Sequence, residues 1–517
     1  MSQSTQSQSN SRAINLGEMQ ISDPTQTLLD WMNDPSAFQN ACEPEKWKAF
    51  LSIAKSNWHF SPVQDGPIGA AEKLVGYSAP WEPVWIKFEC GVTQLSGVVT
   101  LLEKLKPGDS QEQKSLFESL DRLRFPAECT ANEIQIRSSL LSLEGQSCAD
   151  ARERIDELEK VGGFWRDSLW AKIGRAPLAC ALEKLVELAS CTLRPVRGAT
   201  AQGMVRAWVA GGWKTDALVL DILSFGLTPL DFAALKVATR ALYDEWLSDA
   251  ANLFAKRVQI AGGSLPQPLH STVLPGTVQV YVVGLRFDLA QRLLGKLEMQ
   301  EAIVHLDWRF GPLPGVPPTA LPAVTPLDWS YFNGGNNLNA QWADGHELSA
   351  ESLRAQLEKE GVSFLADFSD GDPKRSQNAW TECSNFNRLG HDFGAAIAFE
   401  IDSELDSLMA RIIALLNAGW PRVEVVTDHG WLLLPGNLPK CDLLKELTEI
   451  NLGRCARLKP GQISEFMSVR WHWDENVDVI IAPGISCFEE ETEFGCGGLS
   501  LQECVLPIMR VSRNLQL

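Results

Sequence analysis

The sequence predicts an α/β three-layer sandwich in the C-terminal half, preceded by a mainly α-helical domain. Two observations support this division. From about residue 25 to residue 260, apolar residues recur three or four positions apart, which is the period of a helix. Beyond residue 270, short β-branched runs alternate with helical patterns, as expected where helices pack on both faces of a sheet.

Three segments follow from the composition. Residues 1–24 are rich in Ser and Gln, which predicts a disordered tail and not a signal peptide. Residues 25–260 form the predicted helical domain, and a stretch rich in Gly, Pro and Ser around residues 261–275 marks its end. Residues 270–517 form the predicted α/β domain. The helical half carries no motif with a chemical role, so we interpret it as a packing or partner-binding domain.

Charge and cysteine content exclude several classes of protein. The 517 residues include 65 acidic and 46 basic side chains, and the net charge of −19 repels nucleic-acid backbones and anionic membranes. The 12 cysteines include no C-x-x-C pair, which indicates reduced thiols and not a disulfide framework. No apolar run approaches the roughly 18 residues that a membrane span needs. We therefore expect a cytoplasmic protein with no membrane partner.

The individual elements follow from periodicity. A buried strand is predicted at residues 277–283, feeding a helix at residues 287–297. Residues 403–406 have the pattern of a capping box, which would open a helix that runs to Asn417. The remaining predictions are helical patterns at residues 101–105, 111–123, 148–160, 165–173, 180–193 and 233–255, and strands at residues 422–426, 477–482 and 505–511.

The clearest local signal lies just past the strand at residues 422–426. There Asp428 and His429 stand side by side, and both side chains are good ligands for zinc. Gly430 permits the backbone turn that would direct them together. Ligands gather at the carboxyl ends of strands in open α/β sheets, which favours a site at this position. A turn aspartate beside a surface histidine is the structural alternative.

The sequence around this pair resembles the PglZ proteins of the type-B group. Those proteins are components of BREX phage-defence systems and carry an alkaline-phosphatase-superfamily domain. The resemblance covers roughly residues 278–511 and, more weakly, the helical half. The matching stretches are residues 427–440, with the sequence Thr-Asp-His-Gly-Trp-Leu-Leu-Leu-Pro-Gly at the start, and residues 284–288, 453–457 and 497–503.

The resemblance implies a two-metal phosphohydrolase, in which paired zinc ions polarise a phosphoryl group and a Thr or Ser attacks it. Asp428 and His429 match the family's Asp-His pair and would bind one metal. His391 matches the His of an Asp-x-x-Gly-His motif and would bind the other. Cys496 replaces the His of a His-Gly-Gly-Leu-Ser motif, and its thiolate could still hold zinc.

Other positions depart from the family pattern. Val283 stands where the family has an Asp, and it cannot bind a metal. Asn387 stands where the Asp of the second motif belongs, and its amide oxygen is neutral. The nucleophile loop, residues 316–320, fits in two registers. One places Thr319 at the nucleophile, and the other places Pro317 there, which has no hydroxyl.

The predicted function follows from these departures. We expect a PglZ-like component of a BREX system that acts through interactions with other BREX proteins and whose hydrolysis is weakened or lost. One or two zinc ions could bind at Asp428, His429, His391 and Cys496. The alternative is an active metal-dependent phosphatase or phosphodiesterase that uses Thr319 on a phosphate ester or nucleic acid.

Three further features have structural alternatives. Arg286 could contact a phosphate, although an arginine at a helix start is more often a surface ion-pair partner. His472, between two tryptophans, could touch a substrate base or belong to an aromatic cluster under a loop. Cys487 and Cys504 flank Cys496 at irregular spacing and are predicted to be core residues.

Overall fold

The computed structural model describes residues 21–77, 79–105, 123–266, 273–366 and 369–513. The described residues fall into two compact units, one within Met1–Ile136 and Lys160–Cys180 and the other within Arg137–Glu159 and Ala181–Leu517. Most of the predicted tail, and the predicted helix at residues 111–123 apart from its last residue, lie outside the described residues. Among the described residues, no helix is long and apolar enough to cross a membrane.

The first unit is helical, and aromatic side chains fill its core. Its first helix begins at Pro24, where the Asp23 carboxylate caps the helix by accepting a hydrogen bond from the Gln26 N–H at 3.0 Å. Trp31 on this helix packs against Phe50 and Phe60, with ring centroids 5.9 and 5.7 Å away. The helices are α1 Pro24–Asn33, α2 Pro35–Ala41, α3 Pro44–Trp58, α4 Gly66–Val75, α5 Glu82–Gly91, α6 Ser96–Glu103 and α10 Leu169–Lys172, and three more are divided between the units, α8 Pro126–Leu141, α9 Cys148–Gly162 and α11 Pro177–Cys191.

The second unit is built on a six-stranded mixed sheet. β1 pairs in parallel with β6 and β7, whereas β14 runs antiparallel to both β7 and β2. The order across the sheet is β2 Ala302–Phe310, β14 Val505–Arg513, β7 Arg422–Val426, β1 Thr277–Val283, β6 Asn378–Asn385 and β5 Val362–Phe364.

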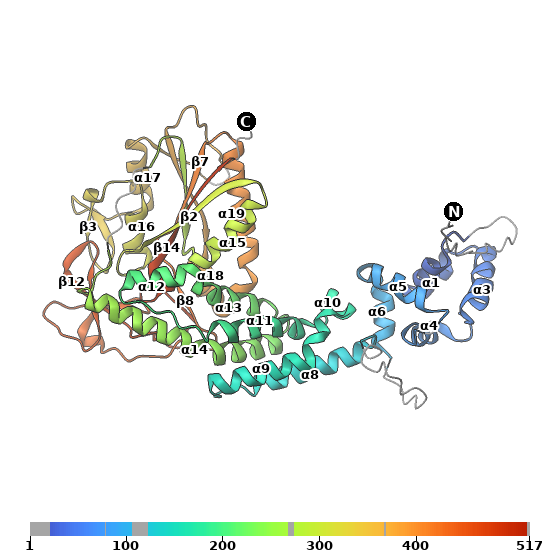
Figure 1. Cartoon of the computed structure of the whole chain (residues 1–517). Coiled ribbons are helices and arrows are strands. Elements are labelled where there is room, and N and C mark those ends of the chain that lie inside the picture. Colours follow the sequence, from blue (N-terminus) through green and yellow to red (C-terminus); the bar gives the residue numbers. More distant parts are fainter. Residues whose placement is uncertain (1–20, 78, 106–122, 267–272, 367–368, 514–517) are drawn as a thin grey trace, which may run out of the picture. The chain divides into compact units, whose positions relative to one another are not determined.

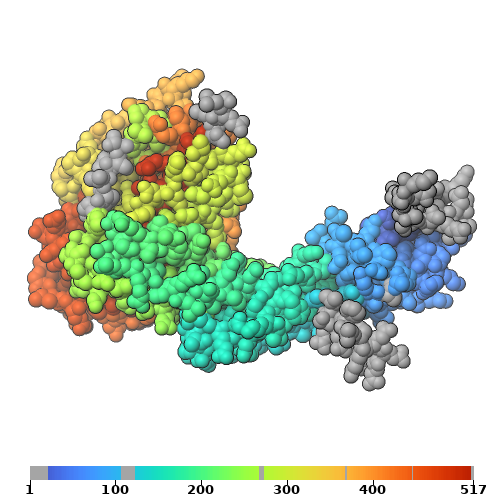
Figure 2. Space-filling view, in the orientation of Figure 1, coloured from blue at the N-terminus to red at the C-terminus, as the bar shows by residue number. Residues whose placement is uncertain are grey.

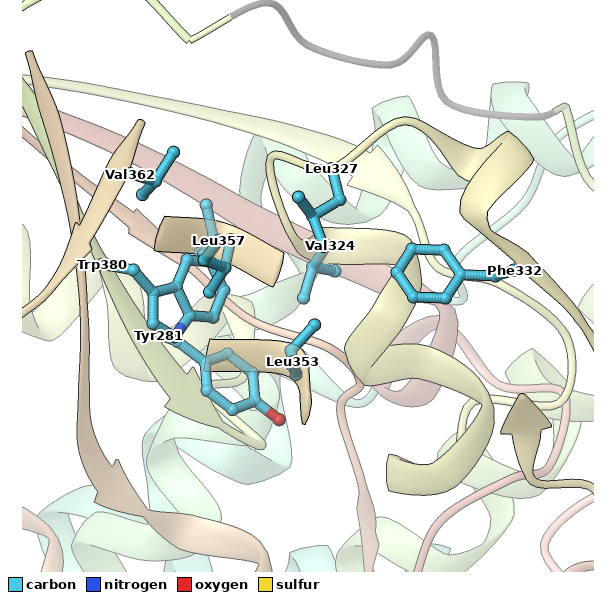
Figure 3. Close-up of a cluster of buried hydrophobic side chains, with 9 residues drawn as sticks. Tyr281, Val324, Leu327, Phe332, Leu353, Leu357, Val362 and Trp380 are labelled. Atoms are coloured by element: carbon cyan, nitrogen blue, oxygen red, sulfur yellow. The ribbon is translucent and has the colours of Figure 1, made fainter. Parts of the chain in front are cut away.

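Helices cover both faces of this sheet, as Figure 1 shows. α15 and α19 pack together on one face. On the other face, α16 and α17 enclose a cluster in which the Tyr281 and Trp380 rings stack with centroids 5.5 Å apart (Figure 3). The helices of the second unit are α12 Ala201–Ala207, α13 Trp213–Ser224, α14 Pro229–Ile260, α15 Phe287–Glu298, α16 Pro317–Val324, α17 Ala350–Lys359, α18 Phe386–Phe393, α19 Ile401–Asn417 and α20 Leu501–Cys504.

Smaller sheets lie beside the main one. A four-stranded antiparallel sheet has the order β11 Ser468–Trp471, β12 Asp474–Ile481, β10 Cys455–Leu458 and β9 Thr448–Asn451. Two two-stranded sheets pair β13 Phe494–Gly495 with β8 Leu432–Leu433, and β3 Phe332–Gly334 with β4 Ala340–Trp342.

The predicted α/β architecture agrees with this mixed sheet between helices, and the strands predicted at residues 277–283 and 422–426 are confirmed. The strand predicted at residues 477–482 is also confirmed: it lies in β12, which belongs to the small antiparallel sheet and not to the main one. One detail is wrong. The predicted capping box at residues 403–406 lies inside α19, which already begins at Ile401 after a 3-10 turn.

Helices α13 and α14 pack directly against the α/β part of the second unit, and the green and yellow surfaces in Figure 2 adjoin there. Buried Asp216 on α13 joins the two parts, because its carboxylate accepts hydrogen bonds from Trp208 Nε1 at 2.8 Å and from Gln502 Nε2 at 2.9 Å. The Tyr243 hydroxyl is a third donor. Burial raises the pKa of Asp216 to about 6.

This raised pKa predicts how stability depends on pH. The folded protein holds the Asp216 proton more tightly than the unfolded chain does, so this group's contribution to stability is present at low pH and is lost as pH rises through about 6. Between about pH 5 and pH 7.5 the wild type should lose about 1 kcal/mol of unfolding free energy relative to Asp216→Asn, measured by urea denaturation. Exposed Asp249→Asn on α14 is the control, and equal pH profiles for Asp216→Asn and the wild type would contradict the expectation.

Candidate functional site

Several predicted site positions meet at the carboxyl edge of the main sheet. β1 ends at Val283, and the N–H of the following Gly284 donates to Asp428 Oδ1, just past β7, at 3.2 Å. The backbone of Asn387 at the start of α18 lies so close to Gly284 that a Cβ there would stand 3.0 Å from the Asn387 nitrogen. Strands adjacent in the sheet therefore bring residues from three distant stretches together.

Both carboxylate oxygens of Asp428 accept hydrogen bonds from the protein itself. The Tyr281 hydroxyl donates to Oδ2 at 2.9 Å. Oδ1 accepts from the backbone N–H of His429 at 3.0 Å, in addition to the bond from Gly284. The side chain of Asp428 is fully buried. Three hydrogen bonds therefore hold the carboxylate, two on Oδ1 and one on Oδ2.

His429 has one nitrogen in use and one without a partner. Its ring is fully buried, Nδ1 lies 2.8 Å from the Gly430 carbonyl oxygen, and no described residue hydrogen-bonds Nε2. Nε2 stands 3.7 Å from Asp428 Oδ2. The turn itself requires Gly430, because a Cβ there would lie 1.9 Å from the Gln502 carbonyl oxygen.

A pocket of about 220 Å³ opens beside these residues. His391 lines it from α18, where the ring meets the edge of Phe494 with centroids 4.9 Å apart. Loss of hydration around the ring lowers the pKa of His391, and His429 acts in the same direction. The Asn387 Oδ1 atom is buried and has no hydrogen-bond partner among the described residues. The pocket is lined by Val316, Pro317, Pro318, Asn387, His391, Asn451, Leu452, Gly453, Cys487, Glu489, Phe494, Gly495 and Cys496.

The cysteines at this site remain protonated. Burial raises the pKa of the Cys496 thiol well above its usual value, and nearby Cys455, Glu503 and Asp428 act in the same direction. Cys487 also lines the pocket, whereas buried Cys504 donates to the Gly498 carbonyl oxygen at 3.6 Å. A thiol must lose its proton to bind zinc, and this surrounding opposes that loss.

Thr319 lies outside the residues that line the pocket. It is fully buried in α16, its hydroxyl donates to the Leu338 carbonyl oxygen at 2.8 Å, and it accepts from Trp471 Nε1 at 3.0 Å. Pro317 and Pro318 line the pocket instead. The structure thus places Pro317, and not Thr319, against the pocket.

The donor set does not fit a pair of zinc ions. Within the described ranges, no three His, Cys, Asp or Glu side chains are grouped so that they could hold a metal ion. Val283 packs against the hydrophobic cluster of Figure 3 and offers only hydrocarbon. Asp428 is hydrogen-bonded within the protein, and Cys496 is held as a thiol. We derive no chemical step through zinc.

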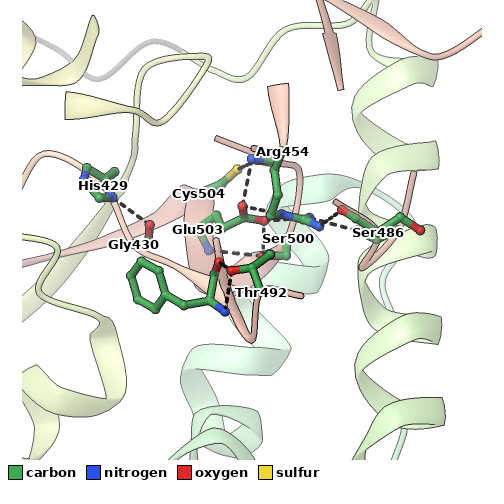
Figure 4. Close-up of polar contacts among 11 residues, drawn as sticks. His429, Gly430, Arg454, Ser486, Thr492, Ser500, Glu503 and Cys504 are labelled. Carbon is green, nitrogen blue, oxygen red and sulfur yellow. Dashed lines mark hydrogen bonds and ion pairs between the residues drawn. The ribbon is translucent and has the colours of Figure 1, made fainter. Parts of the chain in front are cut away.

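A buried ion pair that the sequence does not predict lies close to the pocket. Arg454 and Glu503 are fully buried and joined by bonds of 2.8 and 3.1 Å (Figure 4). Glu503 also accepts from the Gly498 N–H at 2.7 Å and the Ser500 hydroxyl at 2.7 Å. Both residues lie in stretches that match the family pattern, residues 453–457 and 497–503, but the sequence alone does not show that two residues 49 positions apart form a pair.

Arg286 is neither a surface ion-pair partner nor placed against the pocket. Its guanidinium is buried, donates to both oxygens of Asp288 at 2.8 and 2.5 Å, and lies 3.9 Å from the centroid of the Trp431 ring. The prediction of an exposed arginine is therefore wrong.

His472 lies in an aromatic cluster with Trp329 and Trp473, with ring centroids 5.0 and 4.5 Å away, and burial lowers its pKa to about 4.

Comparisons with known proteins give a distant likeness. No protein-family model matches the chain, and no curated protein matches it. Among solved structures, it is similar to murine ectonucleotide pyrophosphatase/phosphodiesterase 5, at 13% identity and a TM-score of 0.33, over 46% of this chain and 88% of that one. An inactive variant of that murine protein in complex with AMP gives 12% identity and a TM-score of 0.32, over 46% and 87%. Similarity at this level does not identify the activity of this chain.

The Arg454–Glu503 pair gives a prediction about stability. Glu503→Gln leaves a buried guanidinium without its counter-charge, which should cost about 3–5 kcal/mol of unfolding free energy. Urea denaturation measures this cost. Replacing both residues, as in Arg454→Met with Glu503→Gln, should recover part of the loss. A Glu503→Gln variant as stable as the wild type would show that the pair does not stabilise the fold.

Proposed function

We propose that this chain is a PglZ-like component of a BREX anti-phage system with a phosphohydrolase-type domain that has lost metal-dependent hydrolysis and acts through protein interactions. The observation that carries the proposal is the hydrogen bonding of Asp428. Tyr281 and two backbone N–H groups already fill about three of the four lone-pair positions of the Asp428 carboxylate, so at most one position, on Oδ2, is left for an ion.

Other residues support a loss of hydrolysis. The hydrocarbon of Val283 and the neutral amide of Asn387 remove negative charge that two neighbouring dications would require. Pro317 faces the pocket, where a nucleophilic hydroxyl would be needed, whereas the Thr319 hydroxyl is engaged elsewhere.

An active metal-dependent phosphatase or phosphodiesterase is the second candidate. One observation favours it: His429 Nε2 is buried, has no partner among the described residues, and points to a missing donor or ion. In this alternative one zinc ion at His429 would act on a phosphate ester or nucleic acid. A cytoplasmic location and partnership with other BREX proteins belong to both candidates.

Hydrolysis of an aryl phosphate ester separates the two functions. With zinc, manganese or magnesium added, the wild type should release product no faster than Asp428→Ala, because no metal-activated oxygen forms. Steady-state absorbance of the released phenol measures the rate. Turnover by the wild type that Asp428→Ala abolishes would refute the loss of hydrolysis.

Restoring the expected ligands tests the alignment of the site. The combined variant Val283→Asp, Asn387→Asp and Cys496→His should bind zinc at least tenfold more tightly than the wild type, measured by calorimetric titration. A variant with alanine at the same three positions is the matched control, and circular dichroism confirms that each variant folds. Equal zinc affinity in the restored and alanine variants would mean that these positions do not form a metal site.

A further inference from the structure

Strand β2 forms one edge of the main sheet. It pairs with β14 along nine residues, Ala302 to Phe310, and no described strand pairs with its other side. The strand contains no proline, lysine or bulge, so charged side chains, Asp307 and Arg309, are the only usual device it carries against pairing with another chain. Ile303 is 41% exposed, and His305 and Asp307 are exposed as well.

The alternation of hydrogen bonds along β2 defines which of its backbone groups face away from β14. The Gly311 N–H donates to the Cys504 carbonyl oxygen at 2.9 Å, in continuation of the register that places Phe310 opposite Val505. Alternate residues of an antiparallel strand bond to the same neighbour, so odd-numbered residues of β2 bond to β14. The N–H and C=O groups of Val304, Leu306 and Trp308 therefore point away from the sheet.

These outward groups are almost all unpaired within the described chain. The Trp308 N–H donates to the carboxylate of its own neighbour Asp307, Oδ1, at 2.8 Å. In the described part of the protein, no backbone hydrogen bond reaches the outward groups of Val304 or Leu306. β2 thus presents a ladder that a second strand could complete.

The sequence of β2 is complementary to itself about Leu306. In an antiparallel pair of two β2 strands centred there, Leu306 faces its own copy in a hydrogen-bonded pair, and Val304 faces Trp308. His305 of each strand then lies directly opposite Asp307 of the other strand, so the pair occurs twice. Both pairs occupy non-hydrogen-bonded positions, where opposing residues are closer together. Centring the pair one residue earlier or later would oppose His305 to itself or Asp307 to itself.

We propose that two copies of this chain pair through their β2 edges, antiparallel and around a twofold axis at Leu306. The two six-stranded sheets would join into one continuous sheet. A second copy is the occupant that this pattern fits, because it supplies an aspartate opposite each histidine at the required spacing. This proposal goes beyond the proposed function and stands whether or not the pocket is catalytic.

Analytical ultracentrifugation of the full chain over a concentration series tests the proposal. Because a nine-residue ladder is smaller than a standard interface, we expect a monomer–dimer equilibrium with a dissociation constant on the order of 10 µM. His305→Asp places like charges opposite each other and should weaken the dimer at least tenfold. Asp307→Lys should weaken it similarly by removing the His–Asp pair.

The double variant is the deciding measurement. His305→Asp with Asp307→Lys places an aspartate opposite a lysine at both positions and should return the dissociation constant to within about threefold of the wild type. Both side chains are exposed, so folding should be unaffected, as circular dichroism would verify. A wild type that remains monomeric to about 100 µM would overturn the proposal, and so would a dimer that neither single variant weakens.

Discussion

The buried carboxylate of Asp428 is the constraint on which the site depends. Its two oxygens join the end of β1, through Tyr281 and Gly284, to the loop after β7. A buried carboxylate of this kind is tolerated when it is hydrogen-bonded. The same bonds that keep the sheet edge together leave about one lone-pair position, on Oδ2, for a metal, so structural integrity and metal chemistry compete for one side chain.

The polar groups around Asp428 follow the same rule. The Arg454–Glu503 and Arg286–Asp288 pairs are buried, and their charges are compensated within the protein. Such pairs position loops accurately but contribute little net stability compared with apolar packing. His429 Nε2 and Asn387 Oδ1 are exceptions near the pocket, since both are buried without a partner in the described chain. These two atoms are where any ligand of the pocket would gain most from hydrogen bonding.

The sequence was informative where a signal is local. The β-branched runs at residues 277–283 and 422–426 are bounded by Gly or Pro, and they predicted two central strands. β2 was missed because its alternating apolar and polar residues do not form a continuous apolar run. Asp428 could be singled out from its motif, but Tyr281, its partner, lies 147 positions away, and only the pairing of β1 with β7 brings the two together.

The bond from Gln502 to Asp216 has a consequence for biosynthesis. Its two residues are 286 positions apart, so the carboxylate on α13 receives this donor only after most of the polypeptide has left the ribosome. Contacts of such long range are costly to form early and slow the final step of folding. Until then the nascent helices are incompletely packed, and chaperones can bind their exposed apolar surface.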